Sequence, residues 1–204
     1  MTAPEPWSQP ERWPLPIETE RLVLRAPTHD DAPAMFAAIE ASRPSLHPWL
    51  PWPKTENHSL AQTHYTIETF ARQRAESPTP HLHLAIFDRA SGAYLGGTGL
   101  HTFRPDAHQA ETGYWIAQEH RQRSICTEAV IGLTRACFCA QAEGGFGLRR
   151  IEICCSAHNA ASARVADRAG YAAEGRLLAH RWVDGYGWSD TLIFAALAGT
   201  WSTP

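Results

Sequence analysis

The chain has 204 residues, of which 44% are hydrophobic and 19% charged, and its formal net charge is -3. This length suffices for one domain with an apolar core, no apolar run approaches the roughly 20 residues that cross a bilayer, and the slightly acidic balance argues against nucleic-acid binding through charge alone. The first residues show no basic region followed by an apolar stretch, so no secretory signal is visible. We therefore expect a cytoplasmic protein with neither a membrane nor a nucleic-acid partner.

Residues 1–16 contain five prolines and are expected to form an irregular arm rather than a domain. Trp7 and Trp13 in this arm suggest that part of it packs on the body of the protein or on a partner. Residues 20–25 alternate in polarity and are rich in branched side chains, which predicts the first strand.

Two helices are expected next. The first follows Thr28, which is suited to cap it, and Pro44 is expected to begin a proline-rich loop. The second is predicted over residues 59–76. Its apolar members are expected to be Leu60, Tyr65, Ile67 and Phe70.

The rest of the chain predicts a mixed sheet. The expected elements are strands 83–87, 94–102 and 110–117, helix 124–142, strand 150–156, helix 160–169, and strands 177–183 and 188–197. A run of strands followed by alternating helices and strands is typical of a sheet with helices on its faces. We predict an α/β (α+β) fold with a largely antiparallel central sheet of about seven strands and about four helices. It forms one domain over residues 17–200.

The five cysteines are expected to be reduced thiols. Cys137 and Cys139 are two apart on an expected helix, and Cys154 and Cys155 are neighbours on an expected strand, so neither pair directs its thiols to one side. The 11 histidines contain no HExxH pattern. We therefore expect no metal site.

The segment 113–130 carries the clearest chemical signal. A strand ends, a loop holds Arg121 and Arg123, and a helix begins with the small residues Ser124 and Cys126. The first amides of a helix have no partner within it and favour phosphate, and arginines beside them add charged contacts. The alternative is a solvated basic turn.

At this point the sequence resembles the GNAT superfamily of acyl-CoA-dependent N-acetyltransferases, in particular its RimJ/RimL-type branch. The resemblance rests on the opening at 17–25, the strand phrase at 110–116, the loop at 120–129 and the late phrases between 159 and 175. It implies a GNAT-like fold and acetyl-CoA as co-substrate. The residues expected to bind CoA are Trp115, Ile116, Arg121, Gln122, Arg123, Ser124, Ile125, Cys126, Thr127, Asn159 and Ser162.

One departure concerns the small-residue positions of the loop. The family places glycine, then glycine or alanine, where this chain has Ser124 and Cys126. Glycine permits close approach of the backbone to a ligand, and serine adds a Cβ. A modified site with weaker affinity is expected, and a dead site is the alternative. Cys126 is interpreted as a packing residue, with a reactive thiol at a helix N-terminus as the alternative.

The resemblance also implies direct attack of an amine on the thioester, which requires a proton acceptor and a donor to the leaving thiolate. Glu111 is the candidate base, against a solvated strand glutamate. Ser162 is the candidate acid, against a residue that only caps its helix. The aromatic residues Trp49, Trp52 and Tyr65 are candidates for the acceptor side of the cleft, against a role in core packing.

The hypothesis is therefore an acetyltransferase acting on a primary amine, with a protein N-terminal α-amine suggested by the RimJ/RimL resemblance. One alternative acceptor is a small amine such as an antibiotic, a polyamine or an amino acid. An alternative of another class is a non-catalytic CoA-binding or interaction module. The resemblance also suggests a homodimer, to which the arm and the C-terminal hairpin could contribute.

Overall fold

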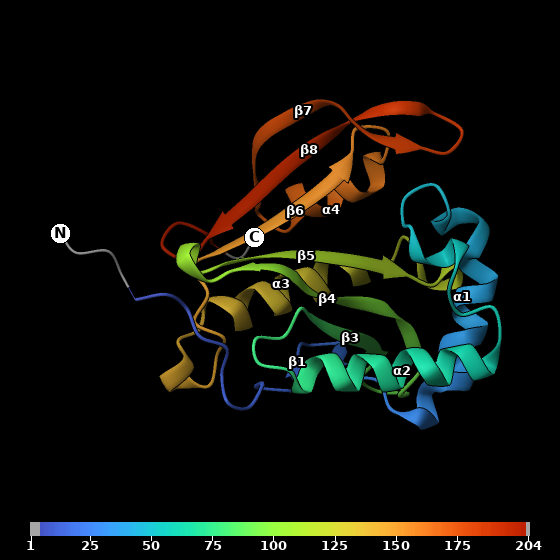
Figure 1. Ribbon diagram of the computed structural model, residues 1–204, viewed down its shortest axis with the longest axis horizontal. Helices are drawn as coiled ribbons and strands as arrows, with labels where there is room; N and C mark the ends of the chain where they lie inside the picture. The colour runs from blue at the N-terminus through green and yellow to red at the C-terminus, as the bar shows by residue number, and fades with distance from the viewer. Residues whose placement is uncertain (1–4, 203–204) are drawn as a thin grey trace.

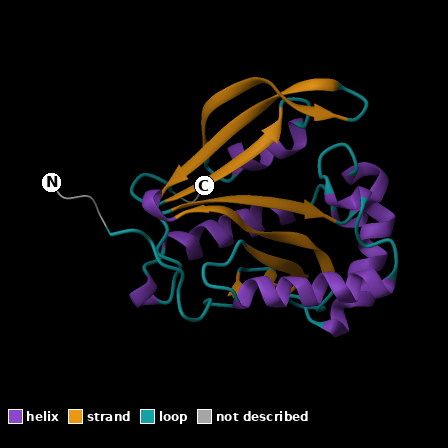
Figure 2. Ribbon diagram, in the orientation of Figure 1, coloured by secondary structure: helices purple, strands orange, loops and turns teal. Residues whose placement is uncertain are grey.

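The computed structural model describes residues 5–202 and shows one mixed sheet with helices on both faces (Figure 1, Figure 2). The described strands are β1 (Ile17–Glu18), β2 (Leu22–Arg25), β3 (His81–Asp88), β4 (Tyr94–Arg104), β5 (Gln109–Ile116), β6 (Arg150–Ser156), β7 (Ala172–Val183) and β8 (Gly187–Leu197). The described α-helices are α1 (Ala32–Leu46), α2 (Leu60–Ala75), α3 (Ile125–Phe138) and α4 (Ala160–Arg168). The strand order is β1-β2-β3-β4-β5-β6-β8-β7.

The predicted fold class is confirmed, with one strand more than expected. Ile17 and Glu18 pair antiparallel with Leu24 and Val23. Such a short strand leaves no periodic pattern, but Ile17 is buried in the core and holds this edge in place.

The strands β5 and β6 are the parallel pair of the sheet, and their pairing is short. It runs from Gln109 opposite Arg150 to Glu111 opposite Glu152 and then stops. The helix α3 makes the crossover that a parallel connection needs. Beyond Glu111 the two strands diverge, as Figure 1 shows.

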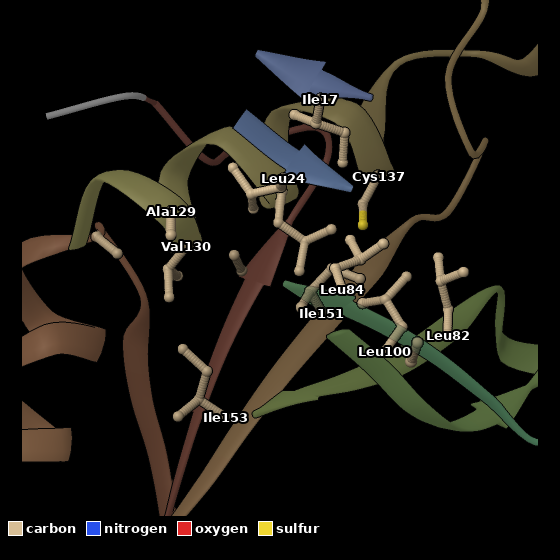
Figure 3. Close-up of a cluster of buried hydrophobic side chains, with 14 of the residues drawn as sticks. Ile17, Leu24, Leu82, Leu84, Leu100, Ala129, Val130, Cys137, Ile151 and Ile153 are labelled. Carbon is tan, nitrogen blue, oxygen red and sulfur yellow. The ribbon is translucent and has the colours of Figure 1, made fainter. Parts of the chain in front are cut away.

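The sheet separates two apolar clusters. Successive residues of β3 point to opposite faces, so Leu84 belongs to the cluster under α3, whereas Ala85 belongs to the cluster under α1 and α2. Figure 3 shows part of the first cluster, where Val130 and Cys137 of α3 lie over Leu24 and Ile151 of the sheet. Both faces of the central strands are therefore buried, which fixes the register of the sheet.

The described part of the N-terminal arm packs on the body, one of the two expected locations. Trp7 stacks on Phe103 with ring centroids 5.4 Å apart, and Trp13 meets Phe146 edge-on at 5.3 Å. The indole nitrogen of Trp7 donates to the Phe146 carbonyl oxygen at 2.8 Å. Residues 5–16 form no helix or strand, yet Trp7 and Trp13 belong to the main core.

The expectation that Pro44 ends the first helix is wrong. Pro44 lies inside α1, which continues to Leu46. Its last turn is held by buried Ser42 and Leu46, and by the Arg43 side chain, which donates to the Asn57 carbonyl oxygen at 2.6 Å. These contacts offset the backbone hydrogen bond that proline removes near the end of a helix.

The third helix is shorter than the predicted 124–142, because the chain turns back tightly after Phe138. The Gly145 amide donates to the Ala140 carbonyl oxygen at 2.9 Å. A Cβ on Gly145 would lie 2.1 Å from the Cys139 carbonyl oxygen, so only glycine fits this return. The glycine pair that was expected to end the helix thus requires it to end four residues earlier.

The exposed side chains of α2 and of the β7–β8 hairpin bear on two predictions. Leu60 and Tyr65 were expected on the apolar face of α2, but both are exposed, Tyr65 to 62%. The edge strand β7 and its partner β8 expose Leu178, Trp182 and Trp188, with Leu178 78% accessible. The homodimer through this hairpin stays a prediction.

Residues 5–202 contain no helix long and apolar enough to cross a membrane. All five cysteines are free thiols. Within the same described range, no group of three or more His, Cys, Asp or Glu side chains is arranged to hold a metal ion.

Candidate active site

A cavity of about 730 Å³ opens where β5 and β6 diverge. The start of α3, the helix α4 and the segment after α1 complete its walls. Its cationic lining residues are Lys54, Arg121, Arg164, Arg168 and Arg181. No Asp or Glu is among its described lining residues, so we call it the basic cavity. This charge favours an anionic ligand.

Unpaired backbone groups face the basic cavity. Strand β5 pairs with β4 as far as Ile116, but with β6 only as far as Glu111. Because peptide groups of a strand point alternately to its two neighbours, every second group of residues 112–116 faces the gap without a strand partner. Apart from the Ile116 carbonyl oxygen, which accepts from Arg121 Nε, these groups are available to hydrogen-bond an extended ligand or to hold an oxyanion.

The start of α3 presents further donors. The first hydrogen bond within the helix runs from the Glu128 amide to the Ser124 carbonyl oxygen at 3.0 Å. The amides of residues 125–127 therefore have no acceptor within the helix. Together with the helix dipole they form a site that favours phosphate, as the sequence predicts.

The two arginines of the loop differ in position. Arg121 Nε donates to the Ile116 carbonyl oxygen at 3.1 Å, and its Nη2 donates to Ser45 Oγ at 2.8 Å. Arg121 therefore ties the end of β5 to α1 while it lines the basic cavity. Arg123 is exposed and is not among the lining residues, although the sequence predicts a contact with CoA.

The loop adopts left-handed backbone at two residues other than glycine. Gln122 has φ 62° and Ser124 has φ 60°. This conformation costs an L-residue about 1–2 kcal/mol. Ser124 thus keeps the backbone shape that glycine permits at this family position, at the cost of strain.

We expect Ser124→Gly to raise the free energy of unfolding by up to about 1 kcal/mol, because glycine adopts this conformation freely and loses part of the gain through unfolded-chain entropy. Ser124→Ala is the matched control, since it keeps the strain and removes only the hydroxyl. Urea denaturation of both variants measures the difference. A Ser124→Gly variant less stable than the wild type would contradict the strain assigned to this loop.

Most of the predicted CoA-binding residues lie together. Those that line the basic cavity are Trp115, Ile116, Arg121, Gln122, Ser124, Ile125, Cys126, Thr127, Asn159 and Ser162. Sequence reasoning did not identify Arg164 and Arg168 on α4 or Arg181 on β7. Nothing in the sequence distinguishes an arginine that lines a cavity from a solvated one.

The Cys126 thiol is packed rather than reactive. Burial raises its pKa to about 12, so it is protonated at neutral pH. The helix N-terminus, which lowers thiol pKa values in open sites, is outweighed here by desolvation. The packing interpretation of Cys126 therefore fits the structure better than a nucleophilic one.

Ser162 has a partner that the sequence did not reveal. The Tyr114 hydroxyl lies 3.1 Å from Ser162 Oγ and also 3.1 Å from the Ser162 carbonyl oxygen. Burial raises the pKa of Tyr114, which keeps its hydroxyl protonated. Asn159 Oδ1 accepts from the Ser162 amide at 3.1 Å, so Asn159 is the residue that caps α4. The period of β5 could have identified Tyr114, because it points to the face opposite Gly113 and Trp115.

A second cavity, of about 780 Å³, lies between the sheet and the helices α1 and α2. We call it the aromatic cavity, because Trp52, Phe70, Tyr94 and Trp115 contribute to its wall. Its described lining contains no Lys or Arg, and its one carboxylate is Glu56.

Three glycines make room for the aromatic cavity above the sheet. They are Gly97, Gly99 and Gly113. The clearest case is Gly97, where a Cβ would lie 2.8 Å from the indole nitrogen of Trp115. The cavity thus depends on the absence of side chains at this part of β4 and β5.

The two cavities meet at Gly113, Tyr114 and Trp115, which line both. The predicted acceptor residues are divided between them. Trp52 and Tyr65 line the aromatic cavity, whereas Trp49 lines the basic cavity and packs against Tyr186 at 5.5 Å. This separation was not visible in the sequence, because both tryptophans belong to one proline-rich loop.

Glu111, the predicted base, lines neither cavity. It lies where β5 and β6 still pair, directly opposite Glu152. Burial raises its pKa, and the Glu152 carboxylate raises it further, while a Cys154 hydrogen bond and the Arg181 charge oppose the shift. On the other side of β5, Glu111 lies opposite His101 of β4.

The geometry defines an α/β protein with a helix start suited to phosphate and a parallel pair of strands that separates beside a basic cavity. Comparison with known proteins identifies the family. Residues 21–172 match the acetyltransferase (GNAT) domain, and the chain belongs to this family of acyl-CoA-dependent N-acetyltransferases. This membership favours the acetyltransferase hypothesis over the non-catalytic alternative.

Individual relatives agree with this assignment. YoaA of Bacillus subtilis (strain 168), an uncharacterized N-acetyltransferase, is 29% identical over 180 residues, which cover 88% of this chain and 94% of YoaA. The structure of RimL, a ribosomal L7/L12 alpha-N-protein acetyltransferase in complex with coenzyme A, matches with TM-score 0.78 at 21% identity, over 90% of this chain and 98% of RimL. Mycobacterium smegmatis RimJ, in complex with CoA-disulfide, matches with TM-score 0.75 at 26% identity, over 87% and 82% of the two chains.

Proposed function

We propose that this acetyltransferase moves the acetyl group of acetyl-CoA directly to the N-terminal α-amine of a polypeptide. The observation that carries the proposal is the meeting of two unlike cavities at Gly113–Trp115. A cationic cavity and an aromatic cavity of nearly neutral charge reach the same three residues of β5. An anionic acyl donor and an amine on an apolar body would meet there.

The basic cavity fits acetyl-CoA as the donor. Its cations and the amides at the start of α3 suit the phosphates. The unpaired peptide groups of residues 112–116 suit the amide-containing arm of CoA, which would lie beside β5 like a further strand. Asn159 caps α4 through its oxygen, so its Nδ2 group remains a donor for that arm.

Two buried acceptor atoms support a peptide in the aromatic cavity. The side-chain oxygens of Asn57 and Gln73 are buried and have no hydrogen-bond partner among the described residues. Both residues line the aromatic cavity, and Asn57 is only 2% exposed. Because an unpaired buried acceptor is costly, we propose that the N–H groups of a bound peptide displace the side chains that cover these oxygens and complete their hydrogen bonding.

The charge of the aromatic cavity argues against strongly cationic acceptors. Glu56 is its one described carboxylate, and burial raises the Glu56 pKa. A polyamine or an aminoglycoside carries several ammonium groups and would need several carboxylates. A single amine beside an apolar side chain, as at a polypeptide N-terminus, matches the lining better.

We propose that Ser162, assisted by Tyr114, protonates the leaving thiolate. In our account the Ser162 hydroxyl turns to the sulfur as the C–S bond breaks, and the Tyr114 hydroxyl turns from the Ser162 carbonyl oxygen to Ser162 Oγ. Their 3.1 Å separation allows this exchange. Backbone amides of β5 that face the gap would hold the oxyanion.

The solved structures of relatives support the proposal through their shared fold. RimL is named for α-N-acetylation of a ribosomal protein, but its 21% identity establishes only a shared fold. We therefore take the acceptor of RimL as a guide to which peptides to test.

The test is a panel of acceptors with acetyl-CoA, in which release of the CoA thiol is followed. The panel contains short peptides with free N-termini, together with a polyamine, an aminoglycoside and free amino acids. We expect the highest kcat/KM with peptides that begin with small or apolar residues. A preference for any of the small amines would contradict the proposed acceptor. If no acceptor in the panel stimulates thiol release, that result would contradict amine transfer.

A further inference from the structure

A row of ionisable side chains crosses the sheet under the aromatic cavity. Glu111 of β5 lies opposite His101 of β4, and His101 lies opposite His81 of β3. Residues directly opposite in antiparallel strands project from the same face, with Cβ atoms about 4.5–5.5 Å apart. The rings of His81 and His101 have centroids 6.3 Å apart.

His101 is the member of this row that lies nearest to the junction of the cavities. Its Nε2 atom lies 3.4 Å from the point that a Cβ on Gly113 would occupy. His101 lines the aromatic cavity, together with His81 and His83, whereas Glu111 does not. An amine that enters from the aromatic cavity to reach Gly113 would therefore meet an imidazole before it met the carboxylate.

The hydrogen bonding of His101 allows Nε2 to act as a proton acceptor. Its other nitrogen, Nδ1, lies 3.0 Å from Thr102 Oγ1. A proton on Nδ1 donated to that hydroxyl gives the tautomer in which Nε2 carries a free lone pair.

The surroundings keep this imidazole neutral. Burial lowers the pKa of His101, and His81 lowers it further. Burial likewise lowers the pKa of His83 to about 4, with added repulsion from His81 and His101. Other ionisable groups around the row include Glu56 and Tyr65, which line the aromatic cavity, Glu152, which lies opposite Glu111, and Arg181, whose charge lowers the pKa of Glu111.

We propose that His101 accepts the proton of the attacking amine, and that Glu111 acts behind it as a positioning residue. The amine nitrogen attacks the thioester carbonyl carbon and forms the new C–N bond, and its proton passes to His101 Nε2. The C–S bond breaks, the thiolate takes a proton from Ser162, and Ser162 recovers a proton from water in the basic cavity. His81, next in the row, is the outlet through which the proton leaves toward solvent. This inference rests on the acetyltransferase activity and not on the identity of the acceptor.

The test compares four variants at saturating acetyl-CoA, with the amine that the wild-type protein acetylates fastest. We expect His101→Gln to lower kcat by about 10²- to 10⁴-fold, with the Kd of CoA within about twofold of the wild type. His101→Ala should regain activity when imidazole is added, in proportion to its unprotonated fraction. Glu111→Gln should cost about tenfold or less and shift the acid limb of the pH–kcat profile. His29→Asn, at an exposed histidine on the turn before α1, is the control and should match the wild type.

Several results would overturn the inference. These are a His101→Gln kcat within about threefold of the wild type, a parallel loss of CoA binding, no recovery of His101→Ala with imidazole, or a larger loss in Glu111→Gln than in His101→Gln. A wild-type protein that acetylates a small amine but no peptide would contradict the proposed acceptor alone. The His101 variants would then be measured with that small amine.

Discussion

Ser162→Ala should lower kcat by about 10- to 1000-fold while the Kd of CoA stays nearly unchanged. The Ser162 hydroxyl faces the basic cavity and is positioned by the Asn159 cap and the Tyr114 hydroxyl. Its removal takes away the proton donor to the thiolate but leaves the phosphate-binding helix start intact. Stopped-flow transfer assays and calorimetry with CoA measure the two quantities separately.

The control for this prediction is a double-mutant cycle with Tyr114→Phe. If Tyr114 acts through Ser162, the double variant should be no slower than the slower single variant, because coupled residues are not additive. Unchanged turnover in Ser162→Ala would remove Ser162 from the mechanism. Fully additive losses would mean that Tyr114 acts independently.

Trp7→Ala and Trp13→Ala should each lower the free energy of unfolding by about 3–5 kcal/mol. Both side chains lie in the arm yet are buried in the main cluster against Phe103 and Phe146. A large cavity in this cluster loses transfer energy and packing together. Urea denaturation, followed by tryptophan fluorescence and by circular dichroism, measures the loss.

The matched controls are Trp7→Phe and Trp13→Phe. Trp7 donates to the Phe146 carbonyl oxygen, so Trp7→Phe also loses a buried hydrogen bond. The Trp13 indole nitrogen is buried without a partner among the described residues, so Trp13→Phe removes an unsatisfied donor. Trp7→Phe should therefore be the less stable of the two by about 1 kcal/mol. Wild-type stability in both alanine variants would show that the arm is not part of the core.

Local chemistry made much of the fold and of the CoA loop predictable. The predicted strand 150–156 agrees with β6, because its apolar residues indicate a buried strand. Ser124 is the residue before α3, as the small residues at the start of that helix indicate. The outward position of Arg123 was not predictable. It follows from left-handed backbone at Gln122 and Ser124, and neither residue type requires that conformation.

The acceptor side was harder to predict, because it depends on which strands are neighbours and in what register. The row of Glu111 and His101 exists because β4 and β5 pair in one unbroken register from Gly96 opposite Ile116 to His101 opposite Glu111. A slip of one residue between the strands would leave Glu111 and His101 on opposite faces of the sheet. Glu111 was proposed from its strand position and the family resemblance, whereas His101 is visible only once the register is known.

The most direct test of the account uses two matched peptides and acetyl-CoA. One peptide has a free α-amine and no lysine, and the other has a blocked α-amine and one lysine. Mass spectrometry of the products locates the acetyl group. We expect acetylation of the first peptide at its N-terminus and none of the second, whereas acetylation of the lysine peptide alone would contradict the proposed α-amine acceptor.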